Sequence, residues 1–541
     1  MKTKILTFST LFLCFAFLFS QNEPQDYLSS EFHKDRRESV RNLLPKNSVS
    51  VFFANPVRNR ANDVDYHYHQ DPNFYYLTGF REPHAVLLIF SEYQTVGNLT
   101  FNEIVFVQER NELMEMWNGK RLGADGIKSK LGFEYAFTTD KFTEIVPDLS
   151  IYESVLFFDF KNDVRDDKNN PNDLFSLIEK FKSMANYPSN FNPEKEKYYD
   201  VISLAPNESA ANVAQVLKSN LRYRPSLKND RLLEEFQSAT NQKKLLEIKQ
   251  KIALKAAESN LDAIGLIDIM KQLREIKTKD ELKLMTKAAK ISAIGQVEVM
   301  KAMHPELSEM EIQGIHEFVY KKYNVEYEGY PSIVGGGHNG CILHYIENTK
   351  MRVGNDLVLM DLGAEYHGYT ADVTRTIPAD GTFSPEQKAI YDLVYLAQEA
   401  GINAAVVGAE FRAPHNAAVE VIKKGLMDLG IIKNPKDYRK FFPHGTSHYV
   451  GLDVHDPGTT GPYKSNTIIT VEPGIYVQDN SDCDPKWWGI AVRIEDTVLI
   501  SEDGPINLSV YAPKIWRNWK TNEEKKPFIK FCFTWNSIMC F

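Results

Sequence analysis

The chain has 541 residues, 43% hydrophobic and 25% charged, which is enough for two or three domains of roughly 150 residues each. This composition excludes a disordered, fibrous or small disulfide-stapled protein. The formal net charge of −9 lacks the broad basic excess that binding a phosphate backbone requires, so we expect no nucleic-acid partner. The five cysteines form no CxxC pair, which argues against a thiolate zinc site.

Residues 1–20 have the pattern of a targeting signal. Lys2 and Lys4 precede an apolar run over residues 5–19, and polar residues follow from Ser20. About fifteen apolar residues fall short of the roughly twenty that span a bilayer, so a cleaved secretory signal fits better than a membrane anchor or a lipidated terminus. We expect cleavage near Ser20, export to a periplasm or the extracellular space, and no stable membrane span afterwards.

The next part of the chain predicts an α/β domain followed by a connector. Residues 21–160 begin with a charged, helix-like pattern at 33–44. Residues 161–265 are rich in Asn, Lys and Glu and predict a connector or insertion that is partly helical. Within the first domain, short apolar runs predict strands at 49–54, 85–90 and 103–107.

Residues 266–515 predict a second α+β domain. A helical pattern runs over 267–301, and Ser308 with Glu311 suits a capping box that starts another helix. Residues 516–541 form a basic and then apolar tail, too short to span a membrane. Strand-like runs of the second domain lie at 342–345, 357–362, 372–377, 467–471 and 489–494.

Two aspartates flank a predicted hairpin in this domain. A buried strand ends in Asp361, the dipeptide His367–Gly368 suits a two-residue turn, and the chain returns through Asp372. With that turn Asp361 pairs with Thr374, and both carboxylates share one face of the hairpin. Taken alone, the pair fits either a metal site or two solvated acids.

Three further segments carry histidines and glutamates. His444, His448 and His455 lie close together in sequence, and Glu472 and Glu495 each lie at an apolar strand. One at a time, the histidines also fit surface or core positions, and the glutamates fit charges at a sheet edge. A buried glutamate, however, needs a cation, because an unpaired carboxylate in apolar surroundings becomes neutral.

Together these residues resemble a known site. In order and spacing, the set matches the five metal ligands of the metallopeptidases with the pita-bread fold, and the chain resembles an aminopeptidase P, or Xaa-Pro aminopeptidase. The resemblance covers roughly residues 30–160 and 265–515 and implies an α/β N-terminal domain before a C-terminal pita-bread domain. The five matching positions are Asp361, Asp372, His448, Glu472 and Glu495, and supporting stretches lie at 71–80, 337–345, 368–376 and 451–456.

The resemblance implies a metalloaminopeptidase that releases the first residue of peptides with proline in second position. Two divalent cations would cancel the clustered charge and share a bridging hydroxide as nucleophile; oxygen-rich ligands favour Mn²⁺. Glu472 would also act as general base, while His344 and His455 would bind the peptide near the scissile bond. Matching positions around the substrate and the ligands are Asp63, Trp117, Tyr476 and Arg493.

The resemblance also implies a homo-oligomer, a dimer or a tetramer, because the residue matching Trp117 helps to build a neighbouring subunit's pocket. Two alternatives stay open. A prolidase shares the ligands but cleaves Xaa-Pro dipeptides; Ser447 and the N-terminal match favour aminopeptidase P. A non-catalytic peptide-binding module on the same fold would be expected to have lost ligands, and all five are present.

Overall fold

The computed structural model describes residue 24 and residues 26–514, apart from 222–223, 225–226, 228 and 257. The predicted signal peptide and the tail at 516–541 lie outside the described residues. Internal contacts divide the chain into two compact units. The N-terminal unit is Ser29–Leu273, and the C-terminal unit combines the residues from Arg274 onward with the segment that ends at Leu28.

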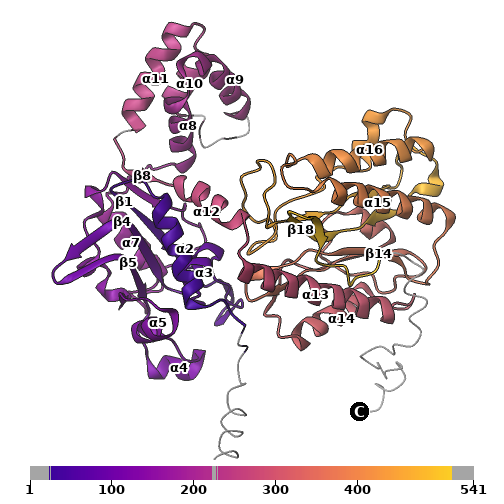
Figure 1. Ribbon diagram of the computed structural model, residues 1–541, viewed down its shortest axis with the longest axis horizontal. Helices are drawn as coiled ribbons and strands as arrows, with labels where there is room; N and C mark the ends of the chain where they lie inside the picture. The colour runs from indigo at the N-terminus through magenta and orange to yellow at the C-terminus, as the bar shows by residue number, and fades with distance from the viewer. Residues whose placement is uncertain are drawn as a thin grey trace, which may run out of the picture. The chain divides into compact units, whose positions relative to one another are not determined.

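The N-terminal unit contains a six-stranded sheet with the order β6-β5-β4-β1-β7-β8 (Figure 1). β1 pairs antiparallel with β4 and parallel with β7, and its side chains are buried on both faces. The three strands predicted in this region are confirmed. The bounds are β1 (Ser48–Phe53), β4 (Val86–Val96), β5 (Leu99–Val107), β6 (Ala136–Thr138), β7 (Ser154–Phe157) and β8 (Leu261–Asp262), with a separate hairpin of β2 (Asn59–Ala61) and β3 (Val64–Asp65).

Helices pack on this sheet, and a group of four more forms a small bundle beside β8 (Figure 1). The bundle, α8 to α11, has its own apolar core, which includes Tyr199, Leu217, Phe236 and Ile252. The predicted helix at 33–44 is confirmed as α2. The bounds are α2 (Ser30–Leu43), α3 (Pro72–Thr78), α4 (Glu112–Asn118), α5 (Gly123–Leu131), α6 (Phe142–Ile145), α7 (Leu174–Met184), α8 (Pro193–Leu204), α9 (Ala210–Leu221), α10 (Arg231–Ser238), α11 (Gln242–Ala256) and α12 (Gly265–Glu275).

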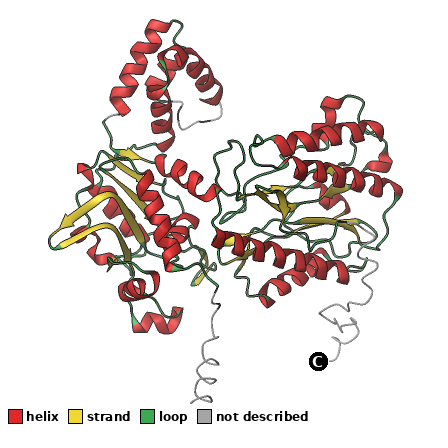
Figure 2. Ribbon diagram, in the orientation of Figure 1, coloured by secondary structure: helices red, strands yellow, loops and turns green. Residues whose placement is uncertain are grey.

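In the C-terminal unit, short sheets lie between two helical layers, α13 with α14 and α15 with α16 (Figures 1 and 2). The sheets have the orders β10-β11-β14, β13-β12-β9, β15-β18-β19 and β16-β17. The helices are α13 (Lys279–Ala302), α14 (Glu309–Lys322), α15 (Pro385–Ala404) and α16 (Ala413–Asp428); the strands are β9 (Tyr327–Glu328), β10 (Ile333–Gly336), β11 (Leu357–Asp361), β12 (Ala364–Tyr366), β13 (Tyr369–Thr370), β14 (Thr374–Pro378), β15 (Thr467–Val471), β16 (Gly474–Tyr476), β17 (Ala491–Arg493), β18 (Asp496–Ser501) and β19 (Gly504–Asn507).

Capping explains where the helices of this unit begin. Ser308 and Glu311 form the predicted capping box at the start of α14, which satisfies two backbone N–H groups that the helix leaves free. The helical pattern at 267–301 is one run in sequence but two helices in the structure. A second capping box, formed by Thr278 and Glu281, starts α13 there.

One predicted strand is wrong. Residues 342–345 follow a short 3₁₀ helix at Gly337–Cys341 and do not extend into a strand. Ile342 is 52% exposed and His344 is exposed as well, so this face of the segment is not buried as a sheet would require. The apolar residues of this segment match the pattern of a strand, but the segment pairs with no other strand among the described residues.

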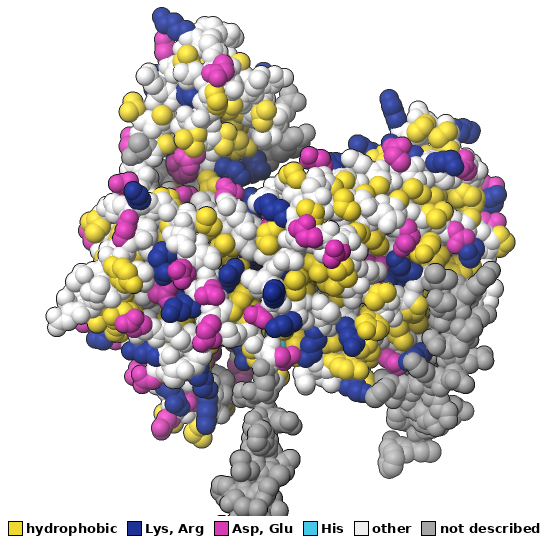
Figure 3. All heavy atoms as spheres, viewed as in Figure 1, with side chains coloured by type: hydrophobic (Ala, Val, Ile, Leu, Met, Phe, Trp, Pro, Cys, Tyr) yellow, Lys and Arg dark blue, Asp and Glu magenta, His cyan; other side chains and the backbone are white. Residues whose placement is uncertain are grey.

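The surface in Figure 3 mixes acidic, basic and apolar side chains over both units, with neither sign gathered into one broad area on that face. Among the helices of the described residues, none combines the length and the apolar character needed to cross a membrane.

Candidate metal centre

A tight hairpin brings the two predicted aspartates together. β12 and β13 pair through Tyr366 and Tyr369, which leaves His367 and Gly368 as the loop. Both loop residues have positive φ, 51° and 85°, as a type I′ turn requires. The predicted pairing of Asp361 with Thr374 is confirmed by the register of β11 and β14.

Tyr330 joins the two carboxylates directly. Its hydroxyl lies 2.6 Å from Oδ1 of Asp361 and 2.5 Å from Oδ1 of Asp372. Thr497 holds the backbone of Asp372: its hydroxyl donates to the Asp372 carbonyl at 2.9 Å and accepts from the Asp372 amide at 3.1 Å. Tyr330 and Thr497 therefore hold the two aspartates that the hairpin brings together.

The imidazole of His448 faces the same cluster. The backbone carbonyl of His448 accepts a hydrogen bond from the amide of Thr470 at 2.9 Å. Strand β15 therefore holds the main chain of His448 in place. The Nδ1 atom lies 2.9 Å from the carbonyl oxygen of Tyr449, which leaves Nε2 toward the carboxylates of Asp372 and Glu472, each 3.5 Å away. A backbone carbonyl on one ring nitrogen is the arrangement that directs the other nitrogen at a metal.

Glu495 completes the set from the loop between β17 and β18. Its Oε2 accepts a hydrogen bond from the hydroxyl of Thr374 at 2.6 Å, and its side chain is almost fully buried. Ligand atoms of Asp372, His448 and Glu495 all lie within 4.8 Å of one another. Three donors at that spacing suit a single ion between them.

The cluster has an excess of negative charge. Burial, with the charges of Asp372 and Glu472, raises the pKa of Glu495 well above its usual range. Burial also raises the pKa of Glu472 to about 7, and burial with the charge of Asp372 raises the pKa of Asp361.

The pKa of His448 is raised as well, which for an imidazole favours the charged form. Burial alone would lower its pKa, but the hydrogen bond to Asp372 and the charge of Glu472 raise it to about 9. The same contact holds the pKa of Asp372 below its usual value despite its burial. One imidazolium and Arg493 do not balance four carboxylates, so the residues fit divalent cations, which would stabilise the ionised carboxylates and the neutral imidazole.

Comparisons with known proteins agree with this geometry. The sequence profile of the metallopeptidase family M24 matches residues 283–502, and that of the aminopeptidase P N-terminal domain matches residues 33–157. The chain is 32% identical over 502 residues to an Xaa-Pro aminopeptidase of Haemophilus influenzae, covering 90% of this chain and 96% of the relative. The chain belongs to the aminopeptidase P family.

Solved structures of aminopeptidases P have the same fold. The Pseudomonas aeruginosa aminopeptidase PepP is 29% identical and superposes with a TM-score of 0.71, covering 92% of this chain and 98% of that one. The Escherichia coli aminopeptidase P with the inhibitor Pro-Leu is 26% identical with a TM-score of 0.70, over 92% and 98% of the two chains. The predicted pita-bread domain behind an α/β N-terminal domain is confirmed.

In this member of the aminopeptidase P family, polar contacts continue from the predicted ligands to three further side chains. Arg493 donates to Oδ2 of Asp361 at 2.6 Å and to the hydroxyl of Tyr476 at 2.9 Å. That hydroxyl lies 2.9 Å from Nε2 of His444, whose Nδ1 is 3.5 Å from Glu472. Arg493 and Tyr476 therefore lie beside the predicted ligands, Arg493 in direct contact with Asp361.

His344 and His455, the histidines predicted to bind the peptide, are both exposed. The ring of His455 is 4.2 Å from that of His448. Burial lowers the pKa of His455 and of His444. Burial, with Arg493, brings the pKa of His444 to about 3, so this imidazole is neutral at physiological pH.

Asp63 and Trp117 belong to the N-terminal unit. Asp63 is exposed in the turn between β2 and β3, and the side chain of Trp117 on α4 is 86% exposed. Their roles near the substrate stay predictions.

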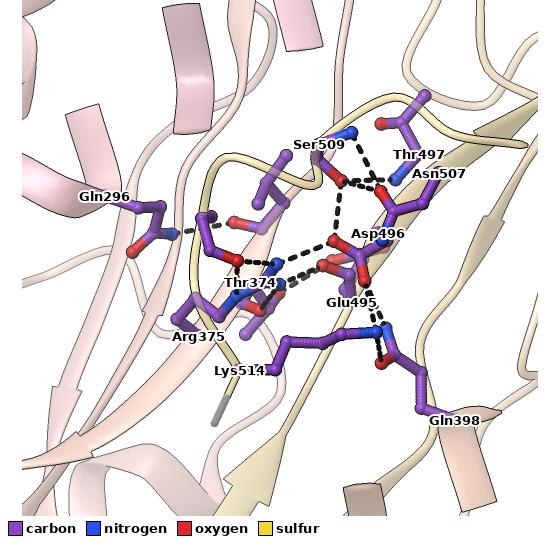
Figure 4. A network of polar contacts seen from close by, with 12 residues as sticks. Gln296, Thr374, Arg375, Gln398, Glu495, Asp496, Thr497, Asn507, Ser509 and Lys514 are labelled. Carbon is purple, nitrogen blue, oxygen red and sulfur yellow. Dashed lines mark hydrogen bonds and ion pairs between the residues drawn. The ribbon is translucent and has the colours of Figure 1, made fainter. Parts of the chain in front are cut away.

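A second polar network lies behind Glu495 (Figure 4). The carboxylate of Asp496 accepts from Arg375 at 2.7 Å and from Ser509 at 2.7 Å, and it lies 3.1 Å from the ammonium of Lys514. Arg375 also donates to the backbone carbonyl of Glu495 at 2.6 Å. This network thus fixes the main chain of Glu495, a predicted ligand.

Sequence reasoning missed the residues that hold the ligands from other elements. Gln296 on α13 donates to the carbonyls of Met360 and Val373, at 3.0 and 2.8 Å, next to the two aspartates. Tyr330 and Thr374 hydrogen-bond to the carboxylates themselves, and Thr497 hydrogen-bonds to the backbone of Asp372. No local pattern marks such residues, because their partners come from distant parts of the chain.

Proposed function

We propose that this chain is a metalloaminopeptidase that releases the N-terminal residue from peptides with proline in the second position. The observation that carries the proposal is the cluster of four carboxylates and the imidazole of His448 described above, in which Asp372, His448 and Glu495 offer ligand atoms within 4.8 Å of one another. Its support comes from the relatives and structures named as Xaa-Pro aminopeptidase and aminopeptidase P. Proline has no amide hydrogen and a fixed φ, so a peptide with proline in second position needs a dedicated site.

The ligands would hold two divalent cations, which lower the pKa of bound water and polarise a carbonyl. Oxygen-rich ligation supports Mn²⁺ as the resident ion. Glu472 would take and return the proton of the attacking water, the role that its match to the family's general base implies. His455 and His344 would donate hydrogen bonds to the peptide where negative charge develops.

The neutral imidazole of His444 has a supporting role in this proposal. Held between Tyr476 and Glu472, it orients the base and offers a polar contact to the peptide without adding a charge. Arg493 opposes the rise in the pKa of Asp361 that burial and Asp372 cause, because its guanidinium donates to that carboxylate at 2.6 Å.

We further propose that the working form is a homo-oligomer in which α4 contacts another subunit. Helix α4 has no buried residue, even though it carries large apolar side chains. Leu113, Met116 and Trp117 are 73%, 83% and 86% exposed. Apolar side chains exposed together on one short helix are typical of a contact surface. Light scattering after chromatography tests this: Trp117→Ala should lower the mass of the assembly, and an unchanged oligomer would contradict it.

Export is proposed on the sequence alone. The pattern of residues 1–20 supports cleavage near Ser20, and mass spectrometry of the purified protein's N-terminus tests it. A mature chain that begins near Gln21 is expected, whereas an intact Met1 in the exported fraction would contradict the proposal.

The activity is tested with metal-stripped protein lacking residues 1–20, assayed with and without Mn²⁺. An Xaa-Pro-Xaa tripeptide, its Xaa-Ala-Xaa analogue and an Xaa-Pro dipeptide are compared. We expect Mn²⁺-dependent release of the first residue from the proline tripeptide. Cleavage of the dipeptide alone would make the chain a prolidase, and no cleavage with Mn²⁺, Zn²⁺ or Co²⁺ would leave a peptide-binding module.

A further inference from the structure

A short segment ahead of the N-terminal unit packs on the C-terminal unit. This N-terminal strap consists of Asp26 and Tyr27, and the chain enters the N-terminal unit at Ser29. The carboxylate of Asp26 accepts from the ammonium of Lys287 at 2.6 Å and from the hydroxyl of Tyr366 at 2.9 Å. The Tyr27 hydroxyl donates to Oε1 of Glu326 at 2.8 Å.

The strap encloses His367, the first loop residue of the β12–β13 hairpin. The Tyr27 ring stacks on the imidazole with centroids 3.6 Å apart, and Tyr366 covers the other side at 3.9 Å. Nδ1 lies 2.6 Å from Glu326 and Nε2 lies 3.0 Å from Asp26. Both ring nitrogens of His367 therefore face a carboxylate, one from the strap and one from the residue that precedes β9.

His367 and the strap lie at one end of the sheet β13-β12-β9. Residues of the predicted metal centre follow its strands. Glu326 directly precedes β9, and Tyr330 follows four residues later; Asp372 follows His367 by five residues. β12 pairs with both β9 and β13, so the two segments run side by side from the strap. At the other end, Tyr330 hydrogen-bonds to Asp372 at 2.5 Å.

We propose that Asp26 and Tyr27 are positioning residues for the metal centre. They clamp the His367 turn against the start of β9, and the three-stranded sheet transmits that restraint to Tyr330 and Asp372. The inference rests on the metal centre of the proposed function. It adds that the exported chain needs the residues just behind its cleavage site for tight metal binding.

The electrostatics of the strap support this assignment. Burial would raise the pKa of Glu326, but the hydrogen bonds and charge of His367 lower it to about 2. Burial is likewise outweighed at Asp26, where Lys287, His367 and Tyr366 hold the pKa well below its usual range. The strap precedes both matched profile ranges, 33–157 and 283–502, so it is not part of what those profiles describe.

The test uses the chain from Gln21 as reference. Variants are the double change Asp26→Ala/Tyr27→Ala, the near-isosteric Asp26→Asn, and Tyr27→Phe, which keeps the stacked ring. Tyr511→Ala is the matched control. Tyr511 is an exposed tyrosine of the C-terminal unit, and its ring lies 5.2 Å from Lys290, which is on α13 like Lys287. Calorimetry measures the Mn²⁺ dissociation constant of stripped protein, and hydrogen exchange follows residues 364–372.

The double variant should bind Mn²⁺ about tenfold more weakly, as when outer partners of metal ligands are removed, with faster exchange at residues 364–372. Asp26→Asn should weaken binding in the same direction, Tyr27→Phe less, and Tyr511→Ala not at all. Unchanged Mn²⁺ affinity in Asp26→Asn and in the folded double variant would overturn the proposal. Should the reference bind Mn²⁺ but cleave no proline peptide, the proposed function fails while the strap is still tested by binding.

Discussion

Glu495 and Asp496 are neighbours in sequence and equally buried, at 1% and 0% exposure, yet their surroundings differ. Asp496 faces Arg375 and Lys514, which overcome the effect of burial and lower its pKa. Glu495 faces other carboxylates, and with burial these raise its pKa well above the usual range. The chain neutralises one carboxylate with its own cations, and we propose that ions from solution neutralise the other.

This comparison teaches how to distinguish structural from functional buried charge. A structural carboxylate is satisfied within the chain, as Asp496 is in Figure 4. A cluster that the chain itself does not balance costs stability unless something binds there. The four predictions below test this difference.

The largest expected effect is on Glu495→Ala. Removing this ligand should abolish peptidase activity and one metal site together, while the metal-free protein stays as stable as the parent, because a repelling charge is lost. Activity, bound metal and thermal unfolding are measured side by side. Glu502→Ala is the matched control, because Glu502 is an exposed glutamate directly after β18. Full activity in Glu495→Ala would show that the site is wrongly assigned.

Arg375→Met should act in the opposite way. It leaves Asp496 buried without its main partner, which we expect to lower the free energy of unfolding by about 3–5 kcal/mol. Urea denaturation of the metal-free protein measures this loss. A loss within about 0.5 kcal/mol, the range of ordinary surface changes, would mean that Lys514 alone balances the carboxylate.

The two carboxylate environments also predict opposite pH dependence in the metal-free protein. The raised pKa of Glu472, about 7, gives stability that is complete below the ordinary glutamate value of about 4.5 and is lost as pH rises through 7. The lowered pKa of Asp496 gives stability that is present at neutral pH and lost in acid.

Between pH 5 and pH 8 the metal-free protein should therefore lose on the order of 1–3 kcal/mol. Saturating Mn²⁺ should remove that loss, because bound cations favour the deprotonated ligands. Unfolding curves at several pH values, with parent and Glu472→Gln, measure both effects. A metal-free protein that becomes more stable from pH 5 to 8 would contradict the charge imbalance.

The smallest effect is expected for Tyr330→Phe. The change removes one hydroxyl that joins Asp361 and Asp372 and leaves the ring, so metal affinity should fall by about tenfold with little change in stability. Competition with a metal-binding dye measures the affinity. Affinity equal to that of the parent would show that the hairpin alone positions the aspartates.

Much of the site could be predicted from the sequence, for reasons of locality. The turn at His367–Gly368 fixes the register of its own hairpin, so Asp361 and Asp372 could be placed together. Gln296 and Tyr330 could not, since each acts across the fold on residues far away in sequence. The strap at Asp26 and Tyr27 lies beside a signal-like segment, where no periodicity distinguishes a docked residue from a linker.

Metal titration of stripped protein tests the central claim most directly. Calorimetry should find two Mn²⁺ ions per chain for the parent and fewer than two for Glu495→Ala, because the cluster holds more negative charge than the chain can balance. No binding to the parent, or equal stoichiometry in the variant, would contradict the account.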